Sequence, residues 1–84
     1  MFGFFRKIDR HSELMNGMAQ RLGVDLGEEV AERHIKAQDY RDALVRCSHC
    51  GSVEACVEWQ KENDHAEVAP PYCRNRDLFA HLAE

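Results

Sequence analysis

Four cysteines constrain this chain more than any other feature, because their spacing predicts a single metal site. They follow the pattern C-x2-C-x5-C-x16-C and are all the cysteines that the chain has: Cys47, Cys50, Cys56 and Cys73. Four thiolates suit metals that are soft toward sulfur, so structural zinc and iron-sulfur clusters are the main candidates. Disulfides or unligated thiols are the remaining interpretation. We expect all four cysteines to bind one metal centre.

The spacing favours an iron-sulfur cluster over zinc. Structural zinc sites usually contain two short pairs of Cys or His ligands, and only Cys47 and Cys50 form such a pair here. Cys56 follows in the same stretch, whereas Cys73 arrives alone after a long connection. We therefore predict a [4Fe-4S] cluster as the cofactor, with zinc as the alternative.

The C-x2-C-x5-C part resembles the cluster loops of two known families. It is similar to the corresponding loop of helix-hairpin-helix DNA glycosylases and to that of WhiB-like regulators, and both families bind a [4Fe-4S] cluster. In those families the remaining cysteine lies upstream of the triplet, whereas Cys73 lies downstream of it. The resemblance implies a cluster at Cys47, Cys50 and Cys56.

The residues beside the cysteines predict how the site is built. Gly51 and Ser52 are typical of a tight loop that ends in a helix N-cap, which places Cys56 in the first turn of a helix. Trp59, one turn further on, is expected to screen the site from water. We interpret His49 as a solvent-facing loop residue, since four cysteines already complete a ligand set.

Three arginines flank the predicted ligands: Arg46, Arg74 and Arg76. They can donate hydrogen bonds to thiolates, neutralise an anionic cluster or contact a partner. The alternative is that they are surface arginines paired with carboxylates such as Asp77.

Apolar residues recur at steps of three and four along residues 3–22, which predicts an amphipathic helix that ends at Gly23. Its stripe contains Phe4, Ile8, His11, Met15, Met18 and Leu22. We interpret the stripe as facing the core. A helix on a membrane surface is the alternative, because phenylalanines and basic residues lie close together near its start.

Further helices are expected along the rest of the chain. Asp25 can cap a short second helix, a third runs from 37 or 38 to 46, a fourth covers 53–62, and Asn75 can cap a last one from 76 onward. No strand-like alternation is present. The sequence thus predicts an all-α single domain over 1–84, with four or five short helices stapled by a four-cysteine metal site. A helical N-terminal half, 1–46, precedes a metal-binding half, 47–84.

The whole chain also resembles a family of small bacterial four-cysteine proteins that is catalogued as a domain of unknown function and occurs chiefly in alphaproteobacteria. The resemblance covers nearly all of the chain, and it implies a bacterial source but no established activity. It rests on these residues: Asp9-Arg10-His11, Met15, Leu22-Gly23-Val24-Asp25-Leu26, Arg46-Cys47, Cys50, Cys56, Trp59 and Ala69-Pro70-Pro71-Tyr72-Cys73-Arg74-Asn75-Arg76.

The length, charge and hydropathy of the chain limit the classes of function that it can have. A chain of 84 residues is near the size at which a hydrophobic core alone gives marginal stability. A net charge of -4 makes nucleic acid an unlikely general partner. The chain shows no signal peptide and no segment that could cross a bilayer, so we expect a cytoplasmic protein.

Three function classes follow from the predicted site. The first is a small iron-sulfur protein that carries electrons or senses oxidants. The alternatives are a zinc-stapled interaction module and a cluster-bearing regulator that contacts nucleic acid. No catalytic motif is found, so we do not expect an enzyme. A protein partner is expected to contact the metal-binding half, and the sequence does not indicate an oligomeric state.

Overall fold

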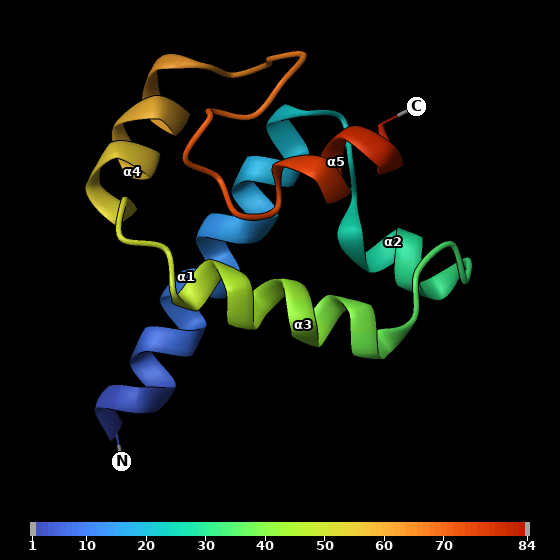
Figure 1. Cartoon of the computed structure of the whole chain (residues 1–84), viewed down its shortest axis with the longest axis horizontal. Coiled ribbons are helices and arrows are strands. Elements are labelled where there is room, and N and C mark those ends of the chain that lie inside the picture. The colour runs from blue at the N-terminus through green and yellow to red at the C-terminus, as the bar shows by residue number, and fades with distance from the viewer. Residues whose placement is uncertain (1, 84) are drawn as a thin grey trace.

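The computed structural model describes residues 2–83, with side chains described from residue 6 onward. Within this range the chain forms helices and no strands (Figure 1). The prediction of a small all-α domain is therefore confirmed. The helices are α1 (Phe2–Arg21), α2 (Leu26–Ala31), α3 (Ala37–Ser48), α4 (Val53–Glu62) and α5 (Arg76–Leu82).

The ends of α1 and α2 have the same local structure. After α1, the N–H of Gly23 donates to Gln20 O and the N–H of Val24 donates to Ala19 O. Gly23 has a φ of 79°, the left-handed conformation in which glycine carries no steric cost. Arg33 occupies the same position after α2 with a φ of 63°. The prediction that Gly23 ends the first helix is thus confirmed.

The start of α2 was also predicted correctly. The carboxylate of Asp25 accepts a hydrogen bond of 3.1 Å from the N–H of Glu28, which satisfies one of the free donors of the first turn. Glu28 and Glu29 lie in that turn, where negative charge complements the helix dipole.

α3 continues to Ser48, two residues beyond the predicted end at Arg46. At its start the carboxylate of Asp39 accepts a hydrogen bond of 2.9 Å from the N–H of Lys36. At its end the hydroxyl of Ser48 donates to Val45 O over 2.7 Å. Cys47 therefore lies in the last turn of a helix and not in the loop after it.

Two predicted caps have the expected position but not the expected bond. Ser52 and Asn75 are the residues that precede α4 and α5, yet neither side chain bonds to its own helix. The Asn75 side chain is buried and bonds instead to α3. Its Nδ2 donates to Ala43 O, and its Oδ1 accepts from Arg46 Nε, both over 2.8 Å.

The core is built on α1, which passes behind α3 and beside α4 (Figure 1). The predicted stripe faces inward, since His11, Met15, Met18 and Leu22 are buried. Ile8 is half-buried, whereas Phe4 lies outside the described side chains. The other helices add Leu26, Ala43 and Phe79, and the connecting segments add Val24, Ile35 and Ala69.

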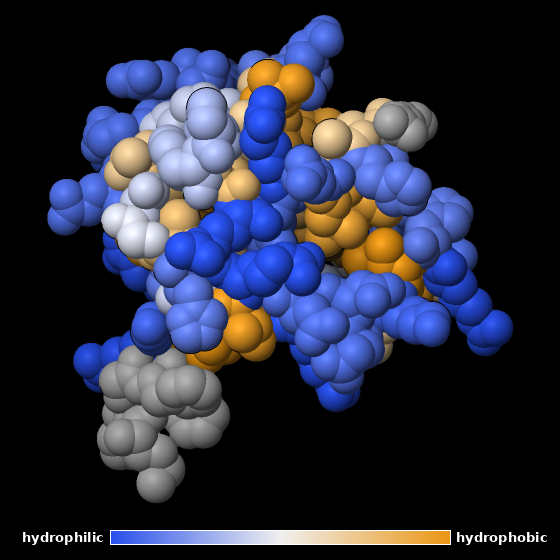
Figure 2. Space-filling view, in the orientation of Figure 1, coloured by the Kyte–Doolittle hydropathy of each residue, from blue (hydrophilic) through white to orange (hydrophobic). Residues whose placement is uncertain are grey.

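The surface is mainly hydrophilic, with hydrophobic residues in separate patches on the face that Figure 2 shows. The exposed large hydrophobic residues among those described are Val45 and Val68. Among residues 2–83 no helix combines the length and the apolar character that crossing a membrane requires.

Candidate metal centre

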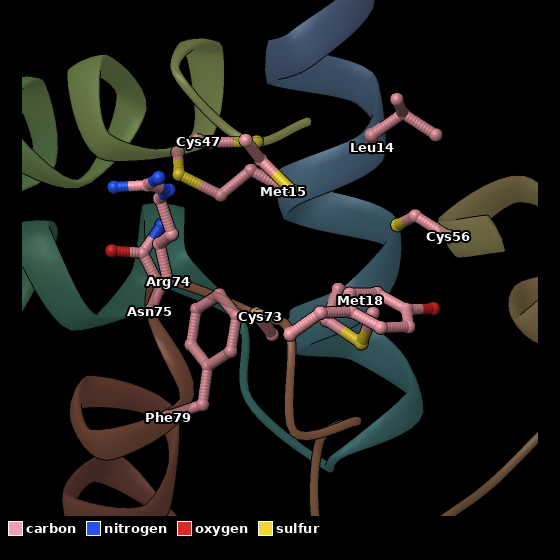
Figure 3. A pocket seen from close by; sticks show the side chains of 11 residues that line it. Leu14, Met15, Met18, Cys47, Cys56, Cys73, Arg74, Asn75 and Phe79 are labelled. Atoms are coloured by element: carbon pink, nitrogen blue, oxygen red, sulfur yellow. The ribbon is translucent and has the colours of Figure 1, made fainter. Parts of the chain in front are cut away.

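The four cysteines line one pocket, although they come from separate parts of the chain. Cys47 is in the last turn of α3 and Cys56 in the first turn of α4. Cys50 lies in the short loop between these helices, and Cys73 lies in the segment before α5. Figure 3 shows Cys47, Cys56 and Cys73 approaching the pocket from these different elements. All four are half-buried free thiols.

Three of the four sulfur atoms accept a hydrogen bond from a nitrogen donor, and a histidine nitrogen lies beside the fourth. The N–H of Ser52 donates to Cys50 Sγ over 3.4 Å, and Gln60 Nε2 donates to Cys56 Sγ over the same distance. The N–H of Asn75 donates to Cys73. His11 Nδ1 lies 3.7 Å from Cys47 Sγ, and the Cys47 thiol also faces the carbonyl of His11 at 3.6 Å. Donors that face a sulfur stabilise its thiolate form.

Burial opposes the thiolate form. Burial, followed by the proximity of the other three cysteines, raises the pKa of Cys47 to about 12. Burial also raises the pKa of Cys56 and the pKa of Cys73, and the hydrogen bonds from Gln60 and Asn75 offset part of this effect. These three thiols are therefore protonated at neutral pH unless a cation binds among them.

The rest of the pocket wall is largely apolar. α1 contributes Leu14, Met15 and Met18, and α5 contributes Phe79. Tyr72 also lines the pocket, and its hydroxyl oxygen is buried without a hydrogen-bond partner among the described residues. Such an orphaned polar atom is rare in a folded protein, because leaving it unpaired costs free energy.

The donor set fits a thiophilic metal centre, but the described structure is not that of a closed ion site. Within residues 6–83 no group of three or more His, Cys, Asp or Glu side chains is arranged to hold a metal ion. The chemistry of the wall does fit such a centre: it combines four thiols, nitrogen donors to three of them and an unpaired hydroxyl. Cys47, Cys50, Cys56 and Cys73 are the residues that could hold the group.

The other predicted site residues are distributed unevenly. Arg74 is exposed and lines the pocket, whereas Arg46 and Arg76 are exposed and lie outside it. None of the three is ion-paired with a carboxylate in the part of the chain whose side chains are described. Trp59 packs against the core without lining the pocket. His49 is exposed.

The sequence reasoning missed residues that contact or face the sulfurs. Gln60 shares a helix face with Cys56 at a separation of four residues, so its contact could have been expected. His11 was placed on the buried stripe, but its proximity to Cys47 depends on how α1 crosses α3. Tyr72 gave no signal beyond its place next to Cys73.

A family model described as a family of unknown function (DUF6455) matches residues 2–84. This agrees with the predicted resemblance to a family without an assigned function along nearly the whole chain. No curated protein and no solved structure matches the chain. The likeness to the glycosylase and WhiB-like cluster loops stays an observation on cysteine spacing.

Proposed function

Since the chain belongs to this family of unknown function, we propose its function from the site: a small protein that binds a [4Fe-4S] cluster and acts as an electron carrier or a sensor of oxidants. The ligands in this proposal are Cys47, Cys50, Cys56 and Cys73. The cysteine spacing favours a cluster over zinc, as argued from the sequence.

One observation carries the proposal: four free thiols from separate segments share a pocket, and three of the sulfurs accept a hydrogen bond from a nitrogen donor. A metal ligand must be a thiolate, and burial alone disfavours thiolates. The donors that face Cys50, Cys56 and Cys73 reduce that cost, and such donors commonly bond to the sulfurs of iron-sulfur sites. A purely structural cluster of buried thiols has no need of such donors.

The remaining residues would control charge and water. Leu14, Met18 and Phe79 keep solvent away from the sulfurs. The positive charge of Arg21 acts on Cys56 and lowers the cost of its thiolate. The bound cluster would supply one-electron redox chemistry, whose potential depends on hydrogen bonds to sulfur and on exposure.

A carrier or a sensor has to pass its state to another molecule. We propose a protein partner that contacts the metal-binding half, where the exposed Arg74 lines the pocket. The net charge of -4 disfavours nucleic acid as that partner. The proposal places the protein in the cytoplasm, where thiols stay reduced and available to metals.

Anaerobic purification tests the proposal directly. We expect a brown protein that contains iron and inorganic sulfide and absorbs broadly in the visible range. Metal analysis by mass spectrometry and a sulfide assay measure both components on the same sample. A colourless protein with stoichiometric zinc would support the alternative cofactor and overturn the cluster.

A pair of variants tests the ligand set. Cys73→Ala removes the ligand that is remote in sequence, so it should lower the iron content and increase hydrogen exchange over residues 64–83. His49→Ala is the matched control, because His49 is exposed near the same site and should leave both unchanged. Full iron content in Cys73→Ala would exclude Cys73 as a ligand.

A further inference from the structure

The Tyr72 hydroxyl is the polar group of the pocket for which the described fold provides no partner. Its oxygen is buried, and no described residue hydrogen-bonds to it. Tyr72 lines the same pocket as the four cysteines and is next in sequence to Cys73. A tyrosine hydroxyl is protonated at neutral pH and can donate a hydrogen bond.

The surroundings of this hydroxyl determine which acceptor would suit it. The pocket wall consists of thioether, hydrocarbon and aromatic groups together with the cysteine sulfurs. A buried phenol gains most from an anionic acceptor, because charge-assisted hydrogen bonds are about twice as strong as neutral ones. The anionic acceptors of a four-thiolate iron-sulfur centre are its thiolate and sulfide sulfur atoms.

We propose that Tyr72 is a positioning residue whose hydroxyl donates a hydrogen bond to a sulfur atom of the bound cluster. This inference rests on the proposed function and adds a further donor to the three that bond to the cysteine sulfurs. A hydrogen bond to sulfur stabilises the more negative, reduced state of a cluster, so it raises the reduction potential. The hydroxyl has no role in the fold of the metal-free protein.

Tyr40 provides a matched control within the same chain. Its hydroxyl accepts a hydrogen bond of 3.0 Å from Asn16 Nδ2 and lies 3.5 Å from the hydroxyl of Ser12. It does not line the cysteine pocket. Tyr40→Phe and Tyr72→Phe each remove one oxygen atom, but among the described residues only the oxygen of Tyr40 has hydrogen-bond partners.

The experiment compares wild type, Tyr72→Phe and Tyr40→Phe, each with and without the cluster. Without the cluster, Tyr40→Phe should lower the melting temperature by about 4–8 °C, and Tyr72→Phe should leave it unchanged or raise it. With the cluster, Tyr72→Phe should lower the reduction potential and shorten the lifetime of the visible absorbance in air. Tyr40→Phe should leave the potential unchanged.

The outcomes separate this inference from the proposed function. Wild-type protein that contains no iron and sulfide overturns the proposed function and this inference with it. If wild type holds a cluster but Tyr72→Phe has the same potential and lifetime, only the role of Tyr72 is overturned. The role is also overturned if Tyr72→Phe destabilises the metal-free protein as Tyr40→Phe does, because the hydroxyl would then have a partner in the fold.

Discussion

The contact between α1 and α4 predicts an unusual effect for the substitution Gly17→Ala. A Cβ atom at Gly17 would clash with Gln60 Oε1 and lie 3.3 Å from Gln60 Cδ. The Gln60 side chain is buried and held in place, because its Nε2 donates to Leu14 O over 2.9 Å and to Cys56 Sγ over 3.4 Å. Alanine at position 17 therefore displaces the amide and breaks both hydrogen bonds.

Two opposing terms set the magnitude. Replacing glycine by alanine inside a helix stabilises it by about 1 kcal/mol. Against this, the lost hydrogen bond to Leu14 O costs about 1 kcal/mol, and a buried amide left without a partner costs about 1–3 kcal/mol. We expect Gly17→Ala to lower the free energy of unfolding of the metal-free protein by about 1–3 kcal/mol, as the balance of these terms.

A double-mutant cycle with Gln60→Ala isolates the contact. In the Gln60→Ala background no amide obstructs the new methyl group, so Gly17→Ala should raise the free energy of unfolding by about 1 kcal/mol. The expected coupling of about 2–4 kcal/mol exceeds the scatter of additive sites. Urea denaturation followed by circular dichroism measures all four proteins. Equal effects of Gly17→Ala in both backgrounds would refute the proposed contact.

Two further predictions concern the metal-free protein. The pKa of Cys47 is raised from about 9 to about 12. The stability linked to its protonated form is therefore complete below pH 9 and is lost as the pH rises through 12. Melting temperatures measured across this pH range should show the loss, and Cys47→Ala should reduce it. Substitutions at the ends of α1 and α2 should change stability in opposite directions. Gly23→Ala should lower the free energy of unfolding by about 1 kcal/mol, because φ is positive there although a Cβ would meet no atom. Arg33→Gly should raise the free energy of unfolding by about 0.5–1 kcal/mol, because it relieves a positive φ. Denaturation midpoints check both variants, and a stabilising Gly23→Ala would contradict the assignment of strain.

The helices could be predicted closely because local signals determine them. The steps of three and four on α1, the cap at Asp25 and the glycine at position 23 each act over a few residues. α3 runs two residues beyond its predicted end, and the Ser48 hydroxyl donates to Val45 O there. The prediction that the side chains of Ser52 and Asn75 cap α4 and α5 was wrong.

Asn75 shows why such roles escape sequence reasoning. An asparagine before a helix often caps it, but this side chain is only 3% exposed and meets Ala43 O and Arg46 on α3. The hydrogen-bond partners of Asn75 depend on how α5 packs against a helix about thirty residues earlier, and no local sequence pattern indicates that packing. The position of His11 beside Cys47 likewise depends on helix packing and could not be predicted from local sequence. The four cysteines could be grouped into one site because thiols have few other roles in a chain like this.

The way α5 is attached bears on the choice between an electron carrier and a sensor. A helix of seven residues is not stable alone. Its buried residue, Phe79, lines the cysteine pocket, and the segment that leads into it contains Cys73 and Asn75. Leu78 and Leu82 also pack against the core, so part of what holds α5 in place lies in or beside the proposed site. Loss of a cluster to oxidants would loosen the end of the chain and not only empty a pocket. A carrier needs the same structure in both redox states, whereas a sensor needs such a structural change, so this attachment favours the sensor.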